Sequence, residues 1–188
     1  MAILVDQARW PWRGTTWCHL VSDSHLDELH DFAGVLGCRR VSFQGDHYDI
    51  DIDTRRIAVE IGAIECDSRE LVRRLKAAGL RLRPSGYVKW ELDYRIDSAV
   101  DDDVWSALVG RHPHVNRVVD LEPGLDGFHR DATGCFVLKR GDAEAVAVHG
   151  QGELHTGIEN PTLGVFVRHD RFGAWSVESF SPAPSREG

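Results

Sequence analysis

The sequence lacks the motifs by which several common enzyme folds are identified. It contains no Gly-x-Gly-x-x-Gly turn, no glycine-rich loop ending in lysine and no Gly-x-Ser-x-Gly element. The first two bind nucleotide phosphates through backbone amides, and the third carries the nucleophile of many serine hydrolases. Their absence argues against a classical nucleotide-binding fold and against a serine hydrolase.

Cysteine is scarce, and long apolar runs are missing. The four cysteines are far apart and form no Cys-x-x-Cys pair, so we expect free thiols rather than a disulfide framework. The apolar start, residues 2–5, is too short for a signal peptide or a membrane span. A chain of 188 residues is long enough to bury a core without a disulfide or a metal. These features predict a cytoplasmic protein of one large or two small domains, with no membrane contact.

Positive charge is in deficit, and the deficit is uneven along the chain. Residues 1–83 carry 12 Lys and Arg against 13 Asp and Glu, whereas residues 84–188 carry 10 against 17. A surface with such an acidic excess repels the phosphate backbone of nucleic acids. The sequence therefore argues against nucleic-acid binding through the C-terminal half, which would suit a basic protein partner better.

The first 83 residues alternate short apolar runs with amphipathic stretches. Helices are expected at residues 26–36, 54–61 and 68–78, with Asp23 or Ser24 capping the first and Asp67 the last. The strands expected between them lie at residues 2–5, 19–21, 40–44 and 63–66. Because strands separated by helices are typical of parallel sheets, the sequence predicts an α/β domain with a mostly parallel sheet over residues 1–83.

The pattern changes at a joint at residues 84–86. Residues 87–96 alternate apolar and polar side chains, as in a strand with one wet face. A short helix is expected at 101–109, and further strands at 115–121, 135–140, 144–149, 163–169 and 174–180. The sequence thus predicts a β-rich α+β segment with a mainly antiparallel sheet over residues 87–180, followed by a flexible tail at 181–188.

Several motifs in the first 83 residues occur in the order found in a known family. They are Ala8-Arg-Trp-Pro-Trp-Arg-Gly14, Trp17-Cys-His-Leu-Val-Ser-Asp23, Asp46-His-Tyr-Asp49 and Ser68-Arg-Glu-Leu-Val-Arg-Arg74. On these residues the N-terminal half resembles domain of unknown function 4031, a family found in bacteria and in phage genomes. The family has no established activity, so the resemblance implies a shared fold and not a reaction.

Three tryptophans and two arginines crowd residues 9–17. As a ligand site, Trp10 and Trp12 would stack on a planar ring while Arg9 and Arg13 bound phosphate or carboxylate. As a packing element, the indoles would close a small core and the arginines would lie over them in solvent. The sequence leaves both interpretations open.

A second polar group follows the predicted strands and consists of Asp6, His19, Asp23, Asp46, His47 and Asp49. If these side chains converge at one edge of a parallel sheet, they supply acid–base groups or hold Mg²⁺, Mn²⁺ or Zn²⁺. In the competing interpretation Asp23 caps a helix, His47 satisfies backbone groups and Asp6 anchors a turn. Their spacing matches no known ligand signature.

Three further patterns receive the simpler explanation. Residues 49–60 imitate an EF-hand loop, but Thr54 stands where that loop needs glycine. The arginines of the helix after Asp67 suit its solvent-exposed face. The C-terminal histidines have no ligand spacing and are expected singly on the surface; they are His112, His114, His129, His149 and His155.

Two functions from different classes follow from these observations. In the first, the N-terminal domain binds a phosphorylated or other small anionic molecule, for example a nucleotide, with hydrolase or transferase chemistry and a divalent metal as candidate cofactor. Its binding candidates are Arg9, Trp10, Trp12 and Arg13, and its catalytic candidates are Asp6, His19, Asp23, His47 and Asp49. In the second, a non-catalytic interaction or immunity-type module meets a basic protein through the acidic C-terminal sheet.

Overall fold

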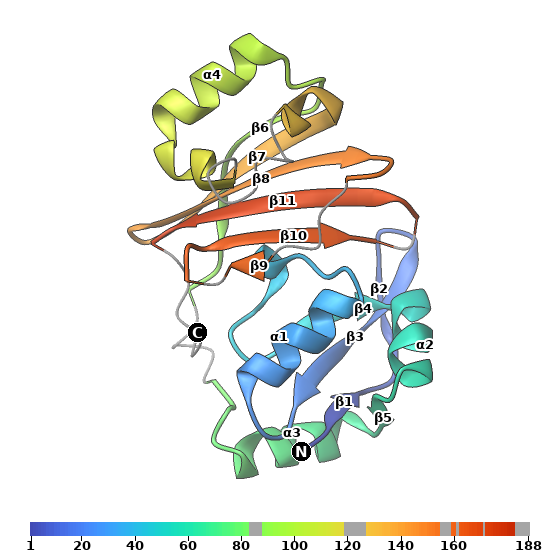
Figure 1. Ribbon diagram of the computed structural model, residues 1–188. Coiled ribbons are helices and arrows are strands. Elements are labelled where there is room, and N and C mark those ends of the chain that lie inside the picture. The colour runs from blue at the N-terminus through green and yellow to red at the C-terminus, as the bar shows by residue number, and fades with distance from the viewer. Residues whose placement is uncertain (83–87, 119–126, 155–158, 161, 171, 183–188) are drawn as a thin grey trace. The chain divides into compact units, whose positions relative to one another are not determined.

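The computed structural model describes residues 1–82, 88–118, 127–154, 159–160, 162–170 and 172–182. The chain divides into two compact units, Met1–Tyr87 with Arg186–Gly188, and Val88–Ser185 (Figure 1). The expected joint at 84–86 and residues 183–188 of the expected tail lie outside the described residues. Among the helices of the described part, none is long and apolar enough to cross a membrane.

The N-terminal unit is an α/β fold built around a five-stranded sheet. β1 and β2 pair with successive parts of β3, and β4 and β5 pair with β3 and β1. The strands are β1 (Ile3–Val5), β2 (Trp10–Trp12), β3 (Thr15–Ser22), β4 (Tyr48–Asp51) and β5 (Ile64–Glu65). The helices are α1 (Leu26–Val35), α2 (Ile52–Glu60) and α3 (Ser68–Ala77), with a 3-10 turn η1 (Arg40–Ser42).

This sheet is mixed, so the prediction of a mostly parallel sheet is wrong. β1 and β5 are parallel, whereas β1–β3, β2–β3 and β3–β4 are antiparallel. The reason lies in the turn at Arg13 and Gly14, whose φ angles of 51° and 78° are both positive. Two such residues form the tight turn that suits a β-hairpin, and a hairpin returns the chain antiparallel. The stretch rich in tryptophan is therefore a hairpin.

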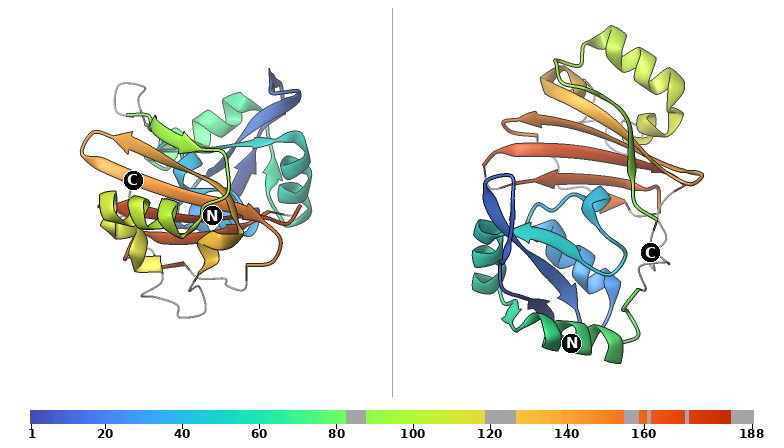
Figure 2. Two further views of the ribbon diagram at one scale, coloured as in Figure 1. Left: turned by 90° about the horizontal axis from the view of Figure 1, so that it is seen from above. Right: turned by 180° about the vertical axis from the view of Figure 1, so that it is seen from behind.

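The two faces of this sheet are covered differently because side chains of β3 alternate. One face carries Cys18 and Leu20 and packs against α1 and α2. On the other, Val21 and its neighbour Leu4 pack against α3. Seen from behind, α1 lies beyond the strands and α3 crosses their lower end (Figure 2, right). The part of the second face beyond α3 is where His19 lies.

Three local expectations in this unit have instructive outcomes. The strand expected at 40–44 is wrong, since η1 occupies residues 40–42 and Phe43 makes only an isolated bridge to Tyr48. The N-cap of α1 is His25, without a side-chain cap bond, in place of Asp23 or Ser24. Asp67 does cap α3, accepting from two backbone amides.

The C-terminal unit contains a six-stranded sheet with the order β6-β7-β8-β11-β10-β9, in which every pairing is antiparallel, as predicted. Its strands are β6 (Glu91–Ile96), β7 (Ala132–Arg140), β8 (Ala143–Gln151), β9 (Glu159–Asn160), β10 (Val165–His169) and β11 (Ala174–Ser181). They are joined by α4 (Asp102–Arg111), η3 (Pro113–Asn116) and η5 (Phe128–Asp131). A strand expected from residue 115 is wrong, because η3 occupies residues 113–116; residues 119–121 lie outside the described part.

Three C-terminal histidines are buried, contrary to the expectation of surface positions. His112 pairs with Glu144 at 2.5 Å and with the Tyr94 hydroxyl at 2.9 Å. His114 is also buried, and its Nδ1 atom lies 3.8 Å from the same Glu144 carboxylate. His129 pairs with the carboxylate of Asp102 at 2.9 Å. The hydrogen bonds satisfy both ring nitrogens of His112 and one of His129. Nε2 of His114 and Nδ1 of His129 are buried without a hydrogen-bond partner among the described residues. His155 lies outside the described residues.

Candidate functional site

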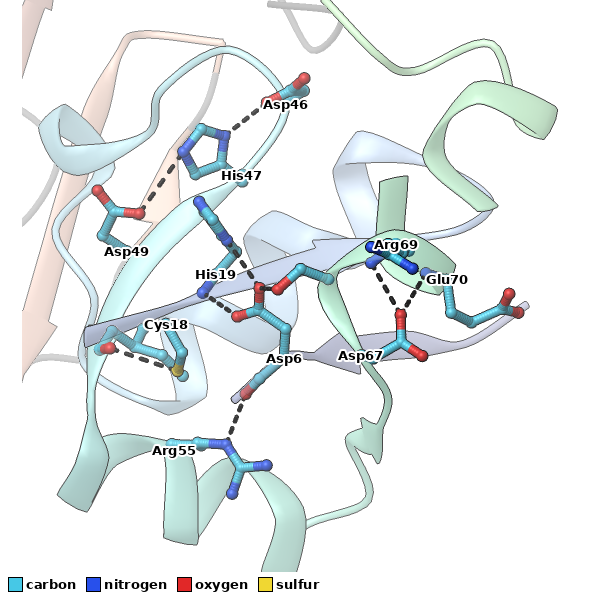
Figure 3. Close-up of polar contacts among 12 residues, drawn as sticks. Asp6, Cys18, His19, Asp46, His47, Asp49, Arg55, Asp67, Arg69 and Glu70 are labelled. Carbon is cyan, nitrogen blue, oxygen red and sulfur yellow. Dashed lines mark hydrogen bonds and ion pairs between the residues drawn. The ribbon is translucent and has the colours of Figure 1, made fainter. Parts of the chain in front are cut away.

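The pairing of β3 with β4 places His19 directly opposite Asp49. Directly opposite residues of an antiparallel pair share a face of the sheet, so both side chains rise from the same side. His47 precedes β4 by one residue, and its ring lies between Asp46 and Asp49, facing the ring of His19 (Figure 3). The site is thus assembled across two neighbouring strands.

Asp6 orients the imidazole of His19. It lies just after β1, where the Nδ1 atom of His19 is 3.0 Å from Oδ2 and the backbone amide of His19 donates to Oδ1 at 2.8 Å. The hydroxyl of Ser68, at the start of α3, donates to Oδ2 at 2.7 Å. Burial acts to raise the pKa of Asp6, but the hydrogen bonds from His19 and Ser68 outweigh it and hold the pKa below 3.8. Asp6 is therefore ionised at neutral pH.

Asp46 orients His47 in the same manner. Its Oδ1 is 2.5 Å from Nδ1 of His47, and its Oδ2 accepts from the Arg81 guanidinium at 2.9 Å and from the Leu82 amide at 3.0 Å. Burial opposes ionisation of Asp46, yet the bonds from His47 and the Leu82 amide, with the charge of Arg81, keep its pKa lowered. In both pairs the carboxylate occupies Nδ1 and leaves Nε2 for other contacts.

The remaining carboxylate, Asp49, closes the group. Its Oδ1 lies 3.5 Å from Nε2 of His47, and its Oδ2 accepts from the side-chain amide of Gln44 at 2.5 Å. The rings of His19 and His47 are 4.9 Å apart between centroids, and the indole of Trp10 meets His19 edge-on at 3.9 Å. One ligand atom each from His19, His47 and Asp49 lies within 4.8 Å of the others.

The three side chains are partly open to solvent. The exposed fractions are 25% for His19, 17% for His47 and 34% for Asp49. Such a position lets water or a small ligand reach the basic nitrogens while the carboxylates behind them remain buried. The arrangement can move a proton at Nε2 or hold a cation between the rings and Asp49.

Other predicted site residues lie apart from this group. Asp23 accepts from the Ala2 amide at 2.7 Å and pairs with Arg74. Because β1 and β3 are antiparallel, Asp23 lies beside the start of β1 whereas Asp6 follows its end. Arg9 bonds the side chain of Gln7. The structure therefore separates Asp23 from the other catalytic candidates.

The hairpin turn carries the remaining ligand candidates. Trp12 packs edge-on against Trp17 with a centroid distance of 5.2 Å, and the Arg13 guanidinium lies 4.3 Å over the Trp12 ring. Trp12 and Arg13 border an open depression at the end of the hairpin, which Ile52 of α2 also lines. Trp10 alone among the predicted ligand-binding tryptophans contacts an imidazole of the site.

Several supporting residues were not among the sequence-based site candidates, including Arg81 and Leu82 beside Asp46. Ser68 reaches Asp6 because β5 runs parallel to β1 and α3 begins directly after β5, beside the end of β1. Gln44 supports Asp49 from the loop before β4. Residues that follow two neighbouring parallel strands lie close together, and this rule would have indicated Ser68. It could be applied only once the pairing of β1 with β5 was known.

Comparison with known proteins supports the resemblance of the N-terminal unit. Residues 3–78 match the family described as "Protein of unknown function (DUF4031)". The DUF4031 stretch contains Asp6, His19, Asp46, His47, Asp49 and Ser68, and the rest of the chain matches no family. No curated protein and no solved structure matches the chain.

Proposed function

We propose that the N-terminal unit is an enzyme that hydrolyses, or transfers a group from, a phosphorylated or other small anionic molecule, nucleotides included. The observation that supports this is the meeting of two carboxylate-oriented imidazoles, His19 and His47, beside Asp49. A carboxylate on Nδ1 fixes the tautomer of a neutral imidazole and makes Nε2 the atom that takes a proton. In the proposed reaction, Nε2 removes the proton of an attacking water or hydroxyl group.

An anionic substrate needs positive charge at a site that already holds the carboxylates of Asp6, Asp46 and Asp49. Arg81 offsets one of these charges through its ion pair with Asp46. Arg9 and Arg69 are both exposed. Each is the sequence neighbour of a residue that contacts the site, because Trp10 meets His19 and Ser68 donates to Asp6. We assign the charged part of the substrate to such cations, and a planar ring, where the substrate has one, to the half-exposed indole of Trp10.

The experiment is a turnover screen with matched histidine variants. Purified protein is offered p-nitrophenyl phosphate, nucleoside mono-, di- and triphosphates and cyclic nucleotides, each with and without added divalent metal. His47→Ala is expected to reduce kcat on any accepted substrate by about 10²- to 10⁴-fold, the usual contribution of a proton-transferring side chain. His25→Ala, which changes an exposed histidine at the start of α1, is expected to leave kcat unchanged.

Equal activity of wild type and His47→Ala would contradict the proposal, as would a screen in which no substrate turns over. The alternative function, contact between the acidic C-terminal sheet and a basic protein, stays a prediction from charge alone. It would gain support if charge reversal in that half removed a binding partner while His47→Ala did not.

A further inference from the structure

We propose that His19, His47 and Asp49 bind a divalent transition-metal ion, of the class Zn²⁺, Co²⁺, Mn²⁺, Fe²⁺ or Ni²⁺. The role of this ion in a reaction rests on the proposed function, whereas its binding does not. Two imidazoles and one carboxylate form a frequent ligand set for such ions, which leaves further coordination positions open to water or substrate. In this protein the three donors come from two paired strands and one preceding residue.

The second argument is the orientation of both imidazoles. Histidines that bind metals usually donate the other ring N–H to a carboxylate, which fixes the ring and strengthens the ligating nitrogen. Asp6 takes Nδ1 of His19, and Asp46 takes Nδ1 of His47. Each carboxylate is itself held by further donors, including Ser68 on Asp6 and Arg81 on Asp46. The three proposed ligands therefore include two histidines whose rings are each held in place by a hydrogen-bonded carboxylate.

The third argument concerns atoms that the protein itself leaves without hydrogen bonds. Oδ1 of Asp49 is buried and accepts no hydrogen bond within the described residues, although Nε2 of His47 stands 3.5 Å away. Nε2 of His19 likewise makes no hydrogen bond with any described residue. A buried carboxylate oxygen without a partner is costly. A cation between Asp49 and the two Nε2 atoms would satisfy all three.

The distances suit an ion after a small adjustment. Metal bonds of about 2.0–2.2 Å to nitrogen and oxygen place neighbouring ligand atoms about 3–3.5 Å apart. The contact between His47 and Asp49 already has this length at 3.5 Å, and the widest separation in the set is within 4.8 Å. Rotation of the partly exposed His19 and Asp49 side chains would close the difference. Imidazole ligands favour transition metals over Mg²⁺ and Ca²⁺, which prefer oxygen donors.

The ion would also give the site the positive charge that an anionic substrate requires. Asp6, Asp46 and Asp49 contribute three carboxylates, whereas Arg81 is the cation paired with one of them. A divalent ion offsets this excess and polarises a bound phosphate or carboxylate oxygen. The simpler alternative is that His47 bridges Asp46 and Asp49 without any metal, since both ring nitrogens lie near a carboxylate.

The test measures metal binding directly, on full-length protein without an affinity tag. The protein is stripped with a chelator, dialysed and titrated with ZnCl₂ in a calorimeter, and a parallel titration with CoCl₂ is followed by visible absorption. We expect one ion per chain and a cobalt spectrum typical of nitrogen and oxygen ligands. His47→Gln and Asp49→Asn should weaken Zn²⁺ binding by more than about 100-fold, and Asp46→Asn by about 10- to 100-fold because it removes only the orienting carboxylate.

Two matched variants control for the loss of any histidine or carboxylate. His25→Gln and Asp31→Asn alter exposed residues of the same unit and should bind Zn²⁺ as wild type does. Circular dichroism and the thermal midpoint without metal establish that each variant is folded. Asp46→Asn keeps all three ligands, so its intermediate affinity is informative even if a ligand variant fails to fold.

The outcomes separate this inference from the proposed function. Wild type that binds no ion, or His47→Gln and Asp49→Asn variants that bind as tightly as wild type, would overturn the metal site and favour the metal-free bridge from His47 to the two carboxylates. Turnover by stripped protein in excess chelator would overturn the role of the ion in the proposed reaction. One bound ion at these ligands without any turnover would support the metal site and contradict the proposed function alone.

Discussion

At the scale of single residues, the alternation of side chains along β3 gives two consecutive residues different roles. Cys18 and His19 are consecutive in β3, yet Cys18 lies in the core shared with α1 and α2 whereas His19 is partly exposed beside Asp6. The thiol of Cys18 donates to the Ile50 carbonyl at 3.5 Å. The apolar surroundings of Cys18 and the polar surroundings of His19 follow from the alternation of side chains along the strand.

Cys18 is expected to be chemically inert in the folded protein. Burial, followed by the nearby charge of Asp6, raises the pKa of its thiol to about 12, so very little thiolate exists at neutral pH. Alkylation with iodoacetamide at pH 8, read by peptide mass spectrometry, should leave Cys18 unmodified until urea unfolds the chain. Partly exposed Cys38 is the internal control. Labelling of native Cys18 at the rate seen in urea would contradict the assignment.

At the scale of elements, α3 connects three parts of the N-terminal unit. Its first residue, Ser68, donates to Asp6, and its buried side chains Leu71 and Leu75 pack on the sheet. Farther along, Arg74 pairs with Asp23, which follows β3 and lies beside the start of β1. The helix therefore fixes both ends of the β1–β3 pair, one through the site carboxylate and one through an ion pair.

The pair of Asp23 and Arg74 should make stability depend on pH. Burial opposes ionisation of Asp23, but bonds from Arg74 and the Ala2 amide keep its pKa lowered below 3.8. A carboxyl with a lowered folded-state pKa stabilises the protein above its unfolded-state pKa and loses this contribution as the pH falls through the folded-state value. Asp23→Asn should therefore lower the free energy of unfolding by about 1–2 kcal/mol at pH 7. The loss should shrink toward zero below pH 3.8.

Urea denaturation of wild type and Asp23→Asn between about pH 7 and pH 2.5 measures this difference. Asp31→Asn, on the exposed side of α1, serves as the matched carboxylate control and should follow wild type at every pH. A difference that stayed constant with pH would show that Asp23 acts through packing or hydrogen bonding and not through its charge.

At the scale of the whole molecule, the chain has separate cores. The N-terminal unit buries two clusters, on the α1 and α3 sides of its sheet, and the C-terminal unit buries one of its own. The candidate site belongs entirely to the N-terminal unit, because its side chains lie between residues 6 and 68 with support from residues 81 and 82. We therefore expect this unit to fold, and to bind the proposed ion, without the other unit.

A fragment of residues 1–87 should therefore fold by itself and keep the site. It is large enough to bury a core, and we expect a cooperative thermal transition and Zn²⁺ affinity within about threefold of the full chain, a difference of under 1 kcal/mol. A fragment that ends at residue 63 lacks β5 and α3, which cover Leu4 and Val21, and should not fold. Failure of the longer fragment to unfold cooperatively in a calorimeter would show that the two units depend on each other.

Most elements were predictable from the sequence because their signals are local. The apolar periodicity of α1 and α3, the cap at Asp67 and the short apolar runs of β7, β8, β10 and β11 are all signals that act over a few residues. The hairpin at Arg13 and Gly14 was missed because an arginine with positive φ is unusual. The buried histidines were missed because their partners, such as Glu144 for His112, lie 32 residues away.

The sequence by itself determined the residue types, the acidic C-terminal half, most of the helices and strands, and the DUF4031 resemblance. Only the tertiary structure decided that Asp6, His19, His47 and Asp49 meet and that Asp23 does not. The physical reason is that strand register is a long-range property: the pairing of β3 with β4 sets His19 against Asp49, and the parallel pairing of β1 with β5 brings Ser68 to Asp6 across 62 positions. No local pattern of side chains encodes which strand lies beside which.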